Sequence, residues 1–104
     1  MFHTEFEFTL IKGLIDEDGL IHRQGIMRLP TGKDEVCVQK DRHVRENPAY
    51  GILKILSRVI TYVGDISEVT PELLEQLFLV DIIYLQDFFN SINQEIVEIS
   101  ISGE

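Results

Sequence analysis

The stretch Phe2–Ile11, FHTEFEFTLI, decides the fold because its side chains alternate between apolar and polar along an extended chain. Phe6, Phe8 and Leu10 fall on one face of such a chain, and Glu7 falls on the other. A period of two with several aromatic residues is typical of a β-strand that buries one face. The first element of the fold is therefore predicted to be a half-buried strand.

A turn signal follows this strand at Asp18-Gly19, and Asp-Gly is a preferred pair in two-residue hairpin loops. If these two residues form the loop, Phe8 lies opposite Leu29 on the second strand. Both side chains then face the same side of the sheet, in agreement with the apolar pattern. We therefore expect an antiparallel hairpin over about residues 3–29, with Phe8 and Leu29 in contact.

Two helices are predicted in the second half of the chain, each from a capping residue followed by proline. Asn47 precedes Pro48, and Thr70 precedes Pro71. Proline is favoured at the first position of a helix because its missing N–H is not needed there. Apolar residues then recur at helical spacing, and Gly64 is a natural stop for the first helix. The predicted helices span about residues 48–63 and 71–93.

Two segments lie outside these elements. Residues 30–46 connect the hairpin to the first helix, and their pattern allows either a short helix that starts near Thr31 or an extended chain. Residues 96–101, IVEISI, have a high β-propensity and form either a third strand on the hairpin, a strand donated to a neighbouring molecule, or a tail. The whole chain, 1–104, is predicted to be one α+β domain in which the hairpin packs on two main helices.

The second predicted helix is apolar on more than one side. A helix of this kind is buried on several faces, and a chain of 104 residues has little material to cover them all. We therefore expect this helix to contact a protein partner or a second copy of the chain, and a homo-oligomer is the expected state. The candidate partner-binding residues are Phe78, Leu79, Ile82 and Phe89.

Asp81 is unusual because it falls on an apolar stripe of this helix, between Phe78 and Leu85. A charged group in apolar surroundings is costly unless it is paired. Either the buried face of the helix is rotated so that Asp81 lies at its edge, or Asp81 forms a structural ion pair with Arg58 or Lys54 on the preceding helix.

Acidic residues dominate the charge of the chain, which has 18 Asp and Glu against 9 Lys and Arg and a net charge of −9. No Lys or Arg follows Arg58. Such a surface repels the phosphates of nucleic acids and of anionic lipids, so neither is expected as a partner. The residues Lys40, Arg42, His43 and Arg45 form the one basic cluster, which is either a docking patch for an acidic partner or a solvated loop.

The sequence predicts no catalytic, metal or cofactor site. Cys37 and three scattered histidines do not have the spacing of zinc ligands. Cys37 also lacks a nearby His-Asp or His-Asn arrangement that would activate a thiol. No apolar run approaches the roughly 18 residues that a membrane span needs. We therefore expect a cytoplasmic, soluble protein that binds other proteins and is not an enzyme.

Several short stretches within residues 5–93 give the chain a resemblance to a known family. These stretches are FEFTL (6–10), DGLIHR (18–23), GIMRL (25–29), NPAY (47–50), LSRVIT (56–61), VTPE (69–72), and Asp81 with YLQD (84–87). Their order, a hairpin that ends in Arg-Leu and then two helices that end in an Asp…Leu-Gln pattern, resembles the small phage tail assembly chaperone-like proteins. Those proteins belong to contractile-tailed, Mu-like phages and related tail-like particles.

This resemblance implies a non-enzymatic role in the cytoplasm of a bacterial host cell. Such chaperones hold the tape-measure protein while tail-tube subunits polymerise, so tape-measure and tube proteins are the implied partners. Two other roles stay open, a structural subunit of the particle and a small acidic regulator that binds a protein. The composition suits the chaperone role, because exposed apolar surface can hold a partner while acidic charge keeps the complex in solution.

Overall fold

The computed structural model describes the backbone of residues 4–102 and the side chains of residues 4–94. A three-stranded antiparallel sheet with the strand order β1-β2-β3 is combined with helices, as the predicted α+β class with an N-terminal hairpin requires. The elements in chain order are β1 (Glu5–Ile15), β2 (Ile21–Arg28), α1 (Gly32–Lys40), α2 (Arg42–Glu46), the 3₁₀ turn η1 (Pro48–Tyr50), α3 (Gly51–Val59), β3 (Ile60–Val63), α4 (Pro71–Leu74) and α5 (Leu79–Ser102).

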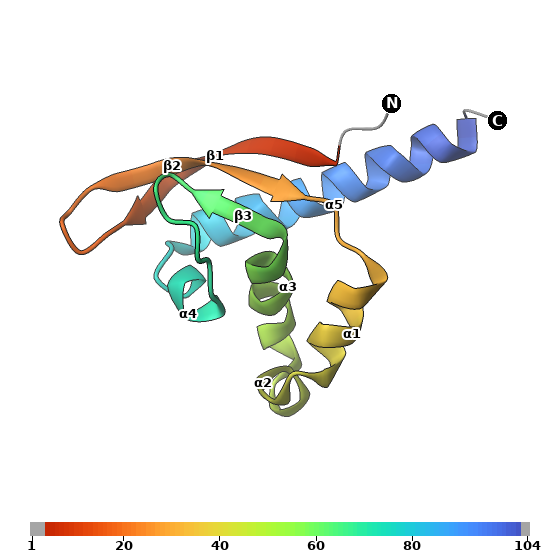
Figure 1. Cartoon of the computed structure of the whole chain (residues 1–104), viewed down its shortest axis with the longest axis horizontal. Helices are drawn as coiled ribbons and strands as arrows, with labels where there is room; N and C mark the ends of the chain where they lie inside the picture. The colour runs from red at the N-terminus through yellow and green to blue at the C-terminus, as the bar shows by residue number, and fades with distance from the viewer. Residues whose placement is uncertain (1–3, 103–104) are drawn as a thin grey trace.

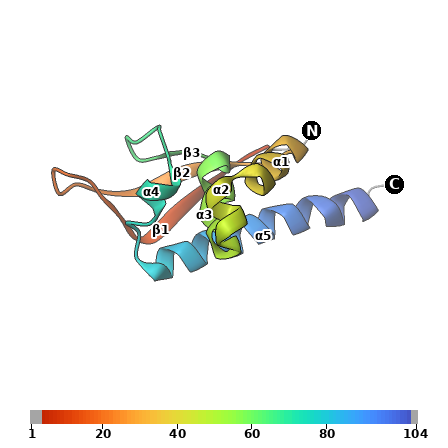
Figure 2. The same cartoon turned by 90° about the horizontal axis from the view of Figure 1, so that it is seen from below.

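The long helix α5 and the hairpin lie side by side along the long axis of the molecule (Figures 1 and 2). Helices α1, α2 and α3 form an arm that projects from the sheet, with α2 at its tip (Figure 1). The chain returns from this arm through α3 directly into β3, which pairs with the free edge of β2. The short helix α4 then leads to the start of α5 near the hairpin.

The hairpin has a different register from the one predicted, because Phe8 pairs with Gly25 and not with Leu29. The register shifts between Thr9 and Leu14, and the last pair before the tip is Ile15 with Ile21, so the loop spans residues 16–20 and is longer than two residues. Asp16 stabilises this wider loop, because its Oδ1 accepts hydrogen bonds from the backbone N–H groups of Asp18 and Leu20 at 2.8 and 2.9 Å. The predicted inward face is nevertheless correct, since Phe8, Leu10 and Met27 are all buried.

The predicted first helix ends earlier than expected, because residues 60–63 form β3. Ile60 and Val63 are three residues apart and therefore also fit a helical stripe, yet both are buried on a strand. Their partner is the unpaired edge of β2, where Val63 lies opposite Gly25. A tertiary pairing thus overrides a pattern that is ambiguous over so short a run.

Three other predicted boundaries are resolved by the structure. The connector 30–46 contains the helices α1 and α2, so the helical alternative is correct. The predicted helix 71–93 is split into α4 and α5 by a break at residues 75–78. The predicted C-terminal strand at 96–101 is wrong, because α5 continues to Ser102. The third strand of the sheet is β3.

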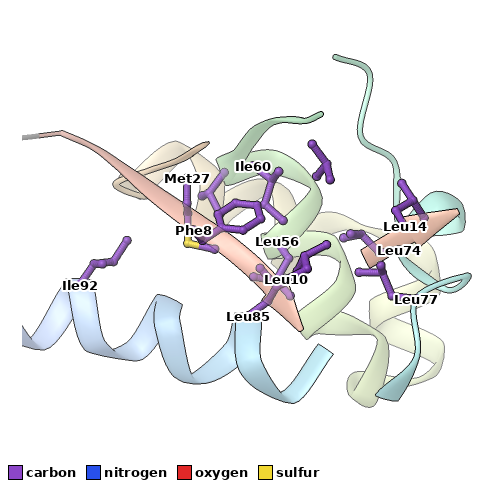
Figure 3. Packing of buried hydrophobic residues seen from close by; sticks show 12 residues of the cluster. Phe8, Leu10, Leu14, Met27, Leu56, Ile60, Leu74, Leu77, Leu85 and Ile92 are labelled. Carbon is purple, nitrogen blue, oxygen red and sulfur yellow. The ribbon is translucent and has the colours of Figure 1, made fainter. Parts of the chain in front are cut away.

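The core lies between the inner face of the sheet, α3 and α5. Leu85 and Ile92 of α5 point towards Phe8 and Met27 of the hairpin, and Leu56 of α3 lies among them (Figure 3). A second group of buried side chains lies towards the hairpin tip, where Leu14, Leu74 and Leu77 come together (Figure 3). This second group anchors α4 and the chain that leads into α5.

Candidate partner-binding site

Two of the four predicted contact residues are strongly exposed at the start of α5. The exposed fraction is 57% for the Phe78 side chain and 71% for Leu79. Val80 and Ile83 are also exposed, although the sequence pattern did not single them out as contacts. We call these four residues, Phe78, Leu79, Val80 and Ile83, the α5 entry surface.

The other two predicted contacts, Ile82 and Phe89, are half-buried and pack against the core. Ile82 joins Leu79 in a hollow of about 410 Å³, which we call the α4 hollow. Phe89 lies elsewhere, in a second hollow of about 510 Å³ between α1, α3 and α5. The structure therefore brings three of the predicted residues to one site and separates Phe89 from them.

The α4 hollow is lined almost entirely by aliphatic side chains. Its lining residues are Ala49, Ile52, Leu53, Leu74, Glu75, Leu77, Leu79 and Ile82. Glu75 is the single charged residue among them. An apolar concavity that continues into exposed apolar side chains is the kind of surface on which a protein partner buries area.

The start of α5 is held in place by Asp81, which is fully buried. Its carboxylate accepts hydrogen bonds from three consecutive backbone N–H groups of β1. Asp81 Oδ1 lies 2.6 Å from the N of Ile11, and Oδ2 lies 3.1 Å from the N of Lys12 and 2.9 Å from the N of Gly13. These three residues lie in the stretch where β1 loses its register with β2, and the carboxylate accepts from backbone N–H groups that the sheet leaves unpaired.

The predicted ion pair between Asp81 and Arg58 is therefore wrong. Arg58 Nε lies 2.8 Å from Oδ1 of Asp34, and Lys54 Nζ lies 3.3 Å from Oδ2 of Asp41. The alternative that Asp81 lies at the edge of the buried face is also wrong, because its side chain is fully buried. The hydrogen-bond donors to the Asp81 carboxylate are backbone N–H groups of β1. A search for basic side chains on the neighbouring helix cannot find such donors.

Arg58, which the sequence suggested as the partner of Asp81, instead forms an ion pair with Asp34. The Nη1 and Nη2 atoms of Arg28 each lie 2.8 Å from a different carboxylate oxygen of Asp34, and Arg58 adds a third contact. The same carboxylate accepts a hydrogen bond from the backbone N–H of Thr31, so it also caps α1. Hydrogen bonds from Arg28, Thr31 and Arg58 hold the pKa of Asp34 far below its usual range. The Thr31…Asp34 spacing was the one signal in the sequence for this role.

One wall of the α4 hollow has an acidic rim. The hydroxyl of Tyr50 lies 3.4 Å from Oε2 of Glu72. Burial raises the pKa of Tyr50, and the charges of Glu72 and Glu75 add to the rise. The Glu72 carboxylate therefore lies at the Tyr50 phenol, and Glu75 of the turn after α4 lines the hollow itself.

The predicted basic cluster lies on the projecting arm, at the end of α1 and in α2. Lys40, Arg42, His43 and Arg45 are all exposed there. Arg42 Nε is 3.2 Å from Oε1 of Glu46, and the His43 ring packs against Tyr50 with 5.5 Å between ring centroids. The two interpretations of this cluster, a docking patch and a solvated loop, both remain predictions.

Within the described part of the chain, no group of three His, Cys, Asp or Glu side chains is placed to hold a metal ion. Among the same residues, no helix is long and apolar enough to cross a membrane. The sequence matches no protein-family model, no curated protein and no solved structure. The resemblance to tail assembly chaperones therefore stays a prediction.

Proposed function

We propose that this chain is a non-enzymatic assembly chaperone of a phage tail or tail-like particle, which binds the tape-measure protein through the α5 entry surface and the α4 hollow. The observation that carries this proposal is the exposure of Phe78 and Leu79 beside an apolar hollow. Apolar side chains of this size on a small protein mark an interaction surface when they form a continuous patch.

The position of this surface is unusually well defined for the end of a helix. Helix ends commonly fray, but Asp81 joins the first turn of α5 to β1 through three backbone amides. Leu77 and Leu74, just before α5, are buried in the core. The exposed residues are therefore presented on a fixed support, which lowers the entropy that a partner must overcome on binding.

The charge of the chain supports the same role. A surface that exposes Phe78, Leu79, Val80 and Ile83 would promote aggregation in a neutral protein. The net charge of −9 opposes such aggregation through repulsion between copies. An assembly chaperone needs both properties, because it must hold an apolar partner and keep the complex soluble.

The test is co-expression with the product of a tape-measure gene from the gene cluster that encodes this chain, and absence of such a gene would contradict the proposal. We expect the wild-type chain to co-purify with that protein and the double variant Phe78→Ser, Leu79→Ser to lose at least about 90% of the captured partner. Both residues are exposed, so the double variant should fold, and its circular dichroism and unfolding midpoint should match the wild type.

The matched control is the double variant Leu20→Ser, Ile21→Ser at the hairpin tip. These side chains are exposed to a similar degree, 58% and 56%, but lie outside the proposed site. This control should retain the partner. Equal capture by both double variants would disprove the site, and failure of the wild-type chain to bind tape-measure or tube protein would disprove the chaperone role. Presence of the chain in purified particles would favour the structural subunit.

A further inference from the structure

The walls of the α4 hollow limit the kind of chain that can bind in it. Its lining residues come from η1, α3, α4, the turn after α4 and α5, so they include no strand edge. An extended peptide gains most of its affinity from a ladder of backbone hydrogen bonds at such an edge. A helix satisfies its own backbone N–H and C=O groups and needs only apolar contacts. The hollow therefore suits a helix.

The edges of the sheet are also poorly suited to receive a peptide strand. On the outer edge of β1, the N–H of Thr9 donates to the hydroxyl of Tyr84 at 3.2 Å, and the N–H of Ile11 donates to Asp81. On the outer edge of β3, Val63 exchanges two backbone hydrogen bonds of 2.9 Å with Ile66. Side chains of α5 and the turn after β3 thus occupy the positions where a further strand would pair.

Charge indicates which helix would bind. Glu75 lines the hollow, and Glu72 lies beside it at the hydroxyl of Tyr50. The two carboxylates would attract Lys or Arg on a bound helix and repel Asp or Glu. Because Glu72 and Glu75 are both exposed to solvent, their charges would act mainly on the choice of partner and on its orientation.

A second copy of this chain does not supply such a helix. The segment of the chain after Arg58, which includes α5, contains acidic residues but neither Lys nor Arg. The basic helix α2, RHVRE, contains one apolar residue, Val44. On the exposed side of α1, Val36 is the one large hydrophobic residue. Helix α3 combines an apolar stripe with Lys54 and Arg58, but Leu56 and Val59 are buried in the core of the same molecule, and the two basic side chains contact Asp41 and Asp34. Helix α3 is therefore not free to enter the hollow of a second copy, and the partner is expected to be a different protein.

We infer that the α4 hollow binds an amphipathic helix of a partner protein, whose aliphatic side chains enter the hollow while flanking Lys or Arg residues contact Glu72 and Glu75. This inference rests on the proposed function and adds the chemistry of the bound segment. In the tape-measure protein, the bound segment would be a helix with apolar residues at i, i+3 or i+4 and i+7, and with basic residues beside that stripe.

The experiment selects peptides from a displayed library of random sequences of about 16 residues, enough for a helix of about 24 Å. The full wild-type chain is the bait, and the variant Leu79→Glu is the bait for counter-selection. We expect enriched peptides that carry a helical apolar stripe with Lys or Arg at its side. A synthetic copy of the best peptide should become helical on binding, and Leu79→Glu should weaken it at least about tenfold.

Charge exchange provides the second measurement. The variant Glu72→Lys, Glu75→Lys should weaken the basic peptide severalfold, and a peptide with Lys replaced by Glu should regain affinity for that variant. Val36→Ser, an exposed change on α1, should leave binding of the basic peptide unchanged. Thermal unfolding of each variant confirms that it is folded.

Each other outcome overturns the inference. Enrichment of acidic or extended peptides, equal binding to the wild type and to Leu79→Glu, or enrichment of the chain's own segments would contradict a basic helical partner. Absence of any selected peptide would contradict a helix-binding hollow. These results are independent of the tape-measure co-purification, so the chaperone role can fail while the hollow still binds a basic helix, and the reverse also holds.

Discussion

Asp34 and Asp81 are both almost completely buried, yet the structure satisfies them in different ways. Asp34 contacts the guanidinium groups of Arg28 and Arg58 and thereby joins β2, α1 and α3. Asp81 contacts backbone amides of β1 and thereby joins α5 to the hairpin. The first site balances charge with charge, whereas the second replaces backbone hydrogen bonds that the sheet does not make. A buried acid therefore does not imply a basic side chain nearby.

The two sites also differ in whether water can reach the hydrogen-bond donors when the carboxylate is removed. The side chains of Arg28 and Arg58 are 35% and 27% exposed, so water can reach them if Asp34 is removed. The amide of Gly13, by contrast, is in a buried hydrogen bond with Asp81. Gly13 also has a φ of +96°, a conformation that other residues rarely adopt. The Asp81 site thus has less freedom to relax.

The largest effect is expected for Asp81→Ala. This change leaves several amides of β1 without acceptors and should lower the free energy of unfolding by about 3 kcal/mol. Urea denaturation measures the change, and hydrogen exchange at Ile11, Lys12 and Gly13 should accelerate more than elsewhere in β1. Asp87→Ala, an exposed change on the same helix, should cost less than about 0.5 kcal/mol. If the two variants were equally stable, Asp81 would not support the bend in β1.

A smaller effect, specific to pH, is expected at Asp34. Its pKa is lowered in the folded state, so the stabilisation is present above the pKa of the unfolded chain, near about 4, and is lost as the pH falls below that value. Between pH 5 and pH 2, the wild type should therefore lose about 2 kcal/mol more stability than Asp34→Asn. Denaturant titrations at several pH values measure this difference. Parallel acid profiles for the two proteins would show that the carboxylate is not stabilised by its arginines.

The smallest effect separates the two sites directly through Arg58. In a double-mutant cycle, Asp34→Ala and Arg58→Ala should show a coupling energy of about 1 kcal/mol or more, because their side chains are in contact. Asp81→Ala and Arg58→Ala should add within about 0.5 kcal/mol. Denaturation of the single and double variants provides both values. Strong coupling between Asp81 and Arg58 would instead indicate the ion pair that the sequence suggested.

The sequence allowed part of the candidate site to be predicted. Phe78 and Leu79 were identified because one helix carried more apolar residues than a small domain can cover, and both are exposed. The partner of Asp81 could not be identified in the same way. Its donors are backbone groups of a strand about 70 residues away, in the stretch where β1, an edge strand, loses its register with β2. No side-chain pattern marks such a position.

The boundaries of the helices and strands were likewise predictable where they depend on local signals and not where they depend on tertiary contacts. Alternation at Phe6, Phe8 and Leu10 predicted β1, and the cap at Thr70 followed by Pro71 predicted the start of α4. These signals are local, because they depend on the chain's own periodicity and on hydrogen bonds within a few residues. Two other segments do not follow their local pattern, which predicted a helix over residues 60–63 and a strand or tail over residues 96–101. Residues 60–63 became β3 because β2 offered an open edge, while residues 96–101 continued α5.

By itself, the sequence determined the α+β class, the inward face of the hairpin, the acidic charge and the surplus of apolar residues at the start of α5. Each of these depends on the composition or on short-range periodicity. Only the tertiary structure decided the hairpin register, the partners of Asp34 and Asp81, and the hollow beside α4. Those features arise where segments distant in the chain meet, and many pairings satisfy one local pattern until packing and buried hydrogen bonds select among them.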